Sequence, residues 1–116
     1  MTGGVHAVGI MMHLLGPIAN GVRPPAGAPP APPGMVPPPF LIRFFLETDI
    51  ETACIFDDMP AAVEGLERMD AMGMVDSAWL ERCPLLDKVR TLPAVAPIRK
   101  HFAERAAKIV EAYRAP

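Results

Sequence analysis

The stretch DDMPAAVEGLERMDAMG, residues 57–73, carries the clearest helical pattern in the chain. Its apolar and small residues recur at spacings of four, three and four, which places them on one face of a helix. An aspartate and a proline open it, as expected where a side chain caps free backbone N–H groups and proline has none to satisfy. Gly73 favours termination in the left-handed conformation. We therefore predict a helix from Pro60 to about Met72. Its apolar face consists of Ala62, Leu66 and Met69.

The residues before this helix predict a second one. FLIRFFLETDIETACIF, residues 40–56, suits a helix better than a strand, because its acidic second half does not alternate between polar and apolar residues. We predict a helix over about residues 40–57. The two helices would then be joined by a tight turn.

The residues after it predict shorter elements. SAWLER, residues 77–82, forms a short helix that must stop before Pro84, because proline disfavours helical geometry in the residue before it. PLLDKVR, residues 84–90, predicts another short turn. A last helix runs from Pro93 or Pro97 to Tyr113. We expect a kink or the later start, since Pro97 would clash inside a helix that began at Pro93.

Proline divides the chain into two parts. Ten of its 15 prolines lie between Pro17 and Pro39, and proline lacks the N–H group that regular structure needs. We therefore expect residues 1–39 to be a disordered, Pro-rich, low-complexity tail and linker. Residues 40–116 form the folded part, and every element predicted there is helical, so the fold class is all-α.

Two segments resemble a known family. Residues 57–69 resemble the middle of a tetratricopeptide repeat, with Ala62 at the small position where two helices cross and Leu66 at the large position that follows. Asp57 stands where the family usually has glycine. GMVDSAWLERCPLLDKVRTLPAV, residues 73–95, is similar to the closing segment of tetratricopeptide arrays at the C-terminus of bacterial multi-domain serine/threonine protein kinases and related signalling proteins. The matching residues are Gly73, Asp76, Trp79, Leu80, Pro84, Leu85, Leu86, Arg90 and Pro93.

The resemblance covers about residues 48–114 and implies a tetratricopeptide-like helical hairpin followed by short turns and a C-terminal helix. It implies a non-catalytic protein–protein interaction module in bacterial signalling, since the chain contains no kinase motif. A repeat buries its apolar face by stacking on neighbours, so the expected partner is a protein, a peptide or neighbouring helical repeats. The small size also leaves open a fragment or cap of a longer array. We expect the partner-binding residues to be Ala62, Leu66, Met69, Met72 and Trp79.

Charge is balanced overall but divided along the chain. The formal net charge is −2, which argues against nucleic-acid binding. Residues 47–81 carry ten acidic side chains and one basic, whereas residues 82–114 carry eight basic and three acidic. The alternative function is therefore a small DNA-associated regulator that uses the basic C-terminal helix. Its contact residues would be Arg99, Lys100, Arg105, Lys108 and Arg114.

The apolar N-terminal residues predict neither export nor a membrane span. The run over residues 5–15 is shorter than a bilayer requires, although it could form a short helix. No lysine or arginine precedes it, unlike in a signal peptide. We expect a cytoplasmic protein with two reduced cysteines, and we keep membrane association through residues 5–20 as a lesser alternative.

The pattern of reactive side chains predicts no catalysis, no cofactor and no metal. The histidines and cysteines form neither a C-x-x-C nor an H-x-x-x-H motif. Cys83, beside Arg82, is the best nucleophile candidate, but no histidine motif accompanies it and it is more simply a packing residue. If the fold exposes an apolar groove, we expect Met72, Met74 and Trp79 at its rim, because methionine adapts to varied partners.

Overall fold

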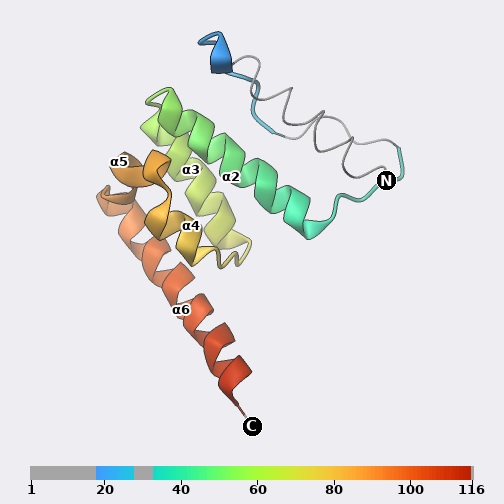
Figure 1. Ribbon diagram of the computed structural model, residues 1–116, viewed down its shortest axis with the longest axis vertical. Helices are drawn as coiled ribbons and strands as arrows, with labels where there is room; N and C mark the ends of the chain where they lie inside the picture. The colour runs from blue at the N-terminus through green and yellow to red at the C-terminus, as the bar shows by residue number, and fades with distance from the viewer. Residues whose placement is uncertain (1–17, 28–32, 116) are drawn as a thin grey trace.

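The computed structural model describes residues 18–27 and 33–115, and their regular structure is entirely helical (Figure 1). The predicted all-α class is confirmed. Three long helices, α2, α3 and α6, account for most of the fold, and short α and 3₁₀ turns join the last two (Figure 1). In chain order, the elements are α2 (Pro39–Ile55), α3 (Met59–Ala71), α4 (Ser77–Arg82), η1 (Pro84–Leu86), α5 (Asp87–Arg90), η2 (Pro93–Val95) and α6 (Ala96–Arg114).

The turn between α2 and α3 follows from local chemistry. Asp58 caps α3, and its carboxylate accepts a hydrogen bond from the backbone N–H of Ala61 at 3.2 Å. Asp57 adopts a φ of 56°, in the left-handed region that glycine adopts most readily. Aspartate tolerates this region better than most residues do. At the other end of α3, Gly73 has a φ of 75°, as predicted.

Prolines set the boundaries of the elements that follow. Pro84 opens η1 and Pro93 opens η2, so each begins where a missing N–H is harmless. The last helix starts at Ala96, which places Pro97 in its first turn. The later start that we predicted is therefore confirmed.

Each of these elements contributes to the main core cluster, and Phe45 forms a smaller second cluster with Leu41 and Phe44. α2 and α3 pack closely, and Gly65 lies at their contact, where an added Cβ would stand 2.5 Å from Cγ1 of Ile50. A glycine is therefore needed at this point for the helices to approach. The buried residues of the cluster are Ile50, Ala53, Ala62, Leu66, Met69, Leu80, Leu86, Val89, Val95, Ile98 and Phe102.

The described part of the proline-rich segment contacts the helical body. Arg23 forms an ion pair with Asp58, with 2.6 Å between Nη1 and Oδ2. The backbone N–H of Gly27 donates to the Asp49 carboxylate at 2.9 Å, and Pro24 is buried. Residues 23–27 of the expected tail are thus placed against the helical body by the carboxylates of Asp49 on α2 and of Asp58, the N-cap of α3. The helix considered over residues 5–15 lies outside the described residues.

Candidate interaction groove

An apolar groove lies at one end of the α2–α3 hairpin, between the first turn of α2 and the loop of residues 72–76. Its volume is about 530 Å³. Phe40, Met72 and Val75 line it and remain 65%, 52% and 36% exposed, respectively. These side chains are thus left uncovered by the fold, whereas the core side chains are completely enclosed. We call this feature the groove; its apolar lining residues are Pro39, Phe40, Ile42, Met72, Met74 and Val75.

Charged side chains border the groove beside a buried carboxyl group. Arg43 and Asp76 line it, and Nε of Arg43 lies 3.6 Å from Oε1 of Glu47. The Glu47 side chain is only 16% exposed, and its Oε2 atom is buried without a hydrogen-bond partner among the described residues. Burial raises the pKa of Glu47 to about 8, and the neighbouring Asp76 carboxylate raises it further than Arg43 lowers it. Glu47 is therefore mostly protonated at pH 7.

The structure places the five predicted partner-binding residues in two different settings. Ala62, Leu66 and Met69 are 0% exposed, so no partner can reach them in this conformation. The expectation for these three is corrected: α2 of the same chain already covers the apolar face of α3. Met72 does line the groove. Trp79 is half-buried outside the groove lining.

Met74 and Trp79 were also expected at the rim of an apolar groove. Met74 lines the groove beside Met72, as expected. The indole Nε1 of Trp79 instead donates to Oε1 of Glu51 at 2.9 Å, which ties α4 to α2. Sequence reasoning missed Phe40 and Val75. A usable signal was present for Phe40, because FLIRFFL contains more apolar side chains than one buried helix face can hold.

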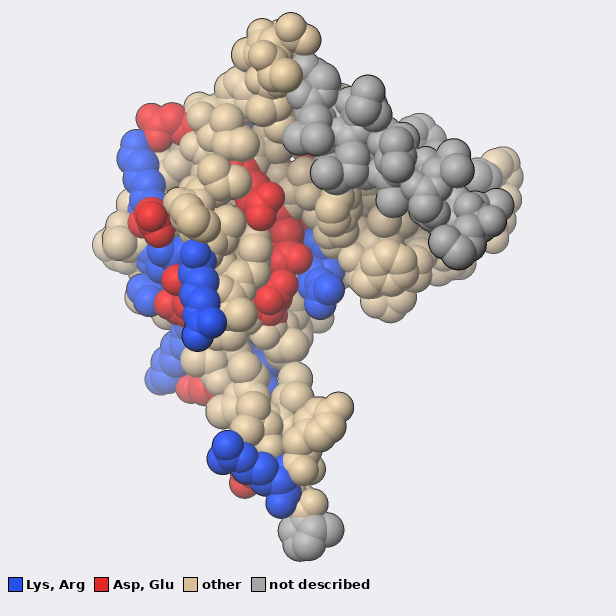
Figure 2. All heavy atoms as spheres, in the orientation of Figure 1, with Lys and Arg blue, Asp and Glu red and all other residues tan. Residues whose placement is uncertain are grey.

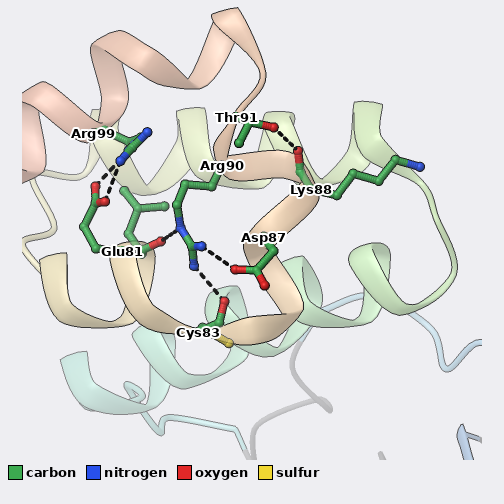
Figure 3. A network of polar contacts seen from close by, with 8 residues as sticks. Glu81, Cys83, Asp87, Lys88, Arg90, Thr91 and Arg99 are labelled. Atoms are coloured by element: carbon green, nitrogen blue, oxygen red, sulfur yellow. Dashed lines mark hydrogen bonds and ion pairs between the residues drawn. The ribbon is translucent and has the colours of Figure 1, made fainter.

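Arg90, one of the residues that carry the family resemblance, has a structural role (Figure 3). Its Nε donates to the carbonyl oxygen of Leu80 and its Nη2 to that of Cys83, both at 2.7 Å. It also forms an ion pair with Asp87, and its side chain is 13% exposed. One guanidinium thus binds the carbonyl oxygen of Leu80 together with that of Cys83, which also accepts a hydrogen bond from the backbone N–H of Leu86.

The same region is fixed to the last helix by a second arginine (Figure 3). Arg99 donates to both carboxylate oxygens of Glu81, at 2.8 and 2.6 Å, and so joins α6 to α4. The hydrogen bond from Arg99 lowers the pKa of Glu81. These contacts hold the short elements in place without contributing to the groove.

Both cysteines have free thiols, and His101 is the one histidine among the described residues. The two thiols are half-buried, and burial raises the pKa of the Cys54 thiol to about 11, which opposes nucleophilic character. Nδ1 of His101 lies 2.8 Å from Oδ2 of Asp70. Within residues 18–27 and 33–115, no group of three or more His, Cys, Asp or Glu side chains is arranged to hold a metal ion. The positions of His6 and His13 lie outside the described residues.

The five basic residues proposed for DNA contact do not form one face. Arg99 is paired with Glu81, Lys100 lies 4.0 Å from Glu104, and Arg105 pairs with Asp70. At 100° per residue, these positions spread around the helix rather than along one side. Only Lys108 and Arg114 of the five have no ion-pair partner among the described residues. Also within the described residues, no helix has the length and apolar character needed to cross a membrane.

Comparisons of this chain with protein-family models, with curated proteins and with solved structures found no match. The resemblance to tetratricopeptide arrays therefore rests on the matched residues alone. The functional argument that follows rests on the groove and on the exposed surfaces next to it.

Proposed function

We propose that this chain is a non-catalytic protein–protein interaction module that binds its partner in the groove. The observation that supports this is the exposure of Phe40, Met72 and Val75 around a single groove of about 530 Å³. Clustered apolar side chains at a surface are a feature of binding sites, because their burial against a partner is favourable. These three side chains contribute little to the core of the fold.

The lining of the groove suits a polypeptide ligand. Met72 and Met74 have flexible, polarisable side chains that can repack against different surfaces. Arg43 and Asp76 place one cation and one anion at the edge, where they can orient a bound chain. The proposed occupant is a protein, a peptide or a neighbouring helical repeat. From the resemblance, we propose a tetratricopeptide-like module in bacterial signalling, in the cytoplasm.

Site-specific photo-crosslinking in the source cells tests this function. A benzophenone amino acid at position 72 should capture a partner, whereas the same group at position 78, exposed on α4, should not. Met72→Glu should abolish capture from a second groove position, residue 40, without lowering the unfolding temperature, because Met72 is 52% exposed. Equal capture at positions 72 and 78, or none at either groove position, would contradict the proposal.

A further inference from the structure

Residues 23–27, with the sequence RPPAG, are held on the α2–α3 hairpin at both ends. At one end, Nη1 of Arg23 lies 2.6 Å from Oδ2 of Asp58, which is the N-cap of α3. At the other end, the backbone N–H of Gly27 lies 3.1 and 2.9 Å from the two carboxylate oxygens of Asp49 on α2. A short segment of the chain is thus attached to two helices in the way that a bound peptide is.

The backbone of this segment is restricted before it docks. Pro24 and Pro25 fix their own φ angles, so less conformational freedom is lost on binding, and Pro24 is buried. Gly27 has a φ of 91°, a conformation that residues with a side chain rarely adopt. The position that donates its N–H to Asp49 therefore favours glycine. An arginine, two prolines and a glycine are the features that the hairpin recognises.

The charge of the hairpin suits a ligand that contains arginine. Residues 47–81 carry ten acidic side chains and a single basic one, Arg68. Figure 2 shows a band of acidic side chains across the middle of the molecule, whereas basic side chains lie mainly beside it and on the projecting end. The hydrogen bond from Arg23 holds the pKa of Asp58 below its usual range. The hairpin therefore attracts a cationic segment, and Asp58 binds it as a carboxylate.

The chain's own segment fills this site incompletely. A hollow of about 140 Å³ lies beside Ala26, and its apolar lining on the helices includes Leu46, Ile50 and Ala61. Alanine contributes only a methyl group, so a longer aliphatic side chain at this position of a ligand would gain contacts in the hollow.

The contacts of the segment are also easily exchanged. The side chains of Arg23 and Asp58 are 39% and 35% exposed. Ion pairs with this much access to water contribute little to stability, because water and salt screen them. A ligand of the same chemistry with a better fit to the hollow can therefore replace residues 23–27.

We propose that the α2–α3 hairpin binds an arginine–proline–proline segment of a partner protein, with a larger aliphatic residue at the position of Ala26, and that residues 23–27 occupy this site until the partner displaces them. The site lies nearer the α2–α3 turn than the groove does, so it adds a second ligand to the function proposed above. A second copy of this chain is a poor occupant. Exchange of segments between two copies forms the same contacts that it breaks, which leaves nothing to offset the freedom lost on association.

Binding of two fluorescent peptides to the full chain, measured by anisotropy, tests the proposal. One peptide has the sequence NGVRPPAG of residues 20–27, and the other has leucine in place of Ala26. Both should bind the Arg23→Asp variant about tenfold more tightly than the native chain, because Asp58 repels the altered segment and leaves the site open. The leucine peptide should bind this variant about threefold or more tighter than the alanine peptide, because it buries more apolar surface.

Matched variants assign the binding to this site. Arg114→Asp, an equal charge change at the end of α6, which projects beyond the rest of the molecule (Figure 1), should leave peptide binding as it is in the native chain. Added to Arg23→Asp, Asp58→Asn should weaken both peptides several-fold, because asparagine still caps α3 but forms no ion pair. Glu67→Gln, an equal loss of charge at an exposed position of α3, should not weaken them. Circular dichroism checks that each variant is folded.

Three results would overturn the proposal. Equal binding to the native chain and to Arg23→Asp, or none to either, would show that residues 23–27 do not occupy a peptide site. Equal affinity of the alanine and leucine peptides would remove the means by which a partner displaces the segment. Dimers of the native chain that Arg23→Asp abolishes, measured by light scattering, would assign the site to a second copy. Crosslinking at position 72 is independent of these results, so the groove function stands or falls separately.

Discussion

The protonation of Glu47 should make the stability of this fold depend on pH. Burial raises the pKa of Glu47 from 4.5 to about 8 in the folded chain, whereas the unfolded chain keeps the ordinary value. Between these two values the folded state holds a proton that the unfolded state has released. The free energy of unfolding therefore falls as the pH rises, by about 1.4 kcal/mol per pH unit. Across the whole interval the loss is on the order of a few kcal/mol.

Glu47→Gln isolates this contribution. Glutamine has nearly the same volume and cannot ionise, so the variant should be more stable than the native chain at pH 8 and close to it at pH 4.5. Urea unfolding followed by circular dichroism, at several pH values in this range, measures the stability of the native chain and of the variant. Burial also raises the pKa of Asp49, but that residue is present in both proteins and cancels in the difference.

The control is an exposed glutamate on the neighbouring helix. Glu67→Gln on α3 removes one carboxylate from an exposed position and so controls for the loss of a surface charge. Parallel stability curves for the native chain and Glu47→Gln would refute the reasoning. They would mean that Glu47 ionises in the folded state as it does in the unfolded chain.

Substitutions at three further positions test the packing. Gly65→Ala should destabilise the fold by about 1–3 kcal/mol, measured by urea unfolding, because the new Cβ meets Ile50. This loss should outweigh the better helix propensity of alanine. A gain in stability would contradict the close approach of the two helices. Arg90→Ala should lower the free energy of unfolding by about 2–4 kcal/mol. Arg90→Lys should lower it nearly as much, because an ammonium group cannot reproduce the contact of the guanidinium with two carbonyl groups. Native thermal stability of the lysine variant would refute this. Asp57→Val should be about 1–2 kcal/mol less stable than Asp57→Gly, because both lose the ion pair with Lys88 but only valine opposes a φ of 56°. Equal unfolding midpoints would show that the turn relaxes.

The helix boundaries were predictable because they depend on local chemistry. Asp58 and Gly73 at the two ends of α3 act on backbone groups within four residues of themselves. Pro84 and Pro93 likewise fix where the short elements begin. Interactions between residues so close in the chain can be predicted from a single sequence.

The location of the groove was not predictable in the same way. The spacing of Leu66 shows that it lies on an apolar face, but the pattern is the same whether a partner or the chain's own α2 covers that face. The exposure of Phe40 and Val75 depends on where two elements end in space. The contact between Arg23 and Asp58 joins residues 35 positions apart, and no periodic pattern marks such a pair. The helices themselves could be predicted from the sequence, whereas their positions relative to one another could not.

The projecting half of α6 is ordered because the other half of the same helix packs on the core. A short helix alone in water is hard to start, because its first turn fixes several residues for one hydrogen bond. Here the docked half, held by Ile98 and Phe102, supplies that first turn, so each later residue has only to extend an existing helix. The exposed side chains of Ile109 and Tyr113 therefore stand on a helix that is already ordered. Covering them would require little further ordering of α6, and ordering is one of the main costs of association.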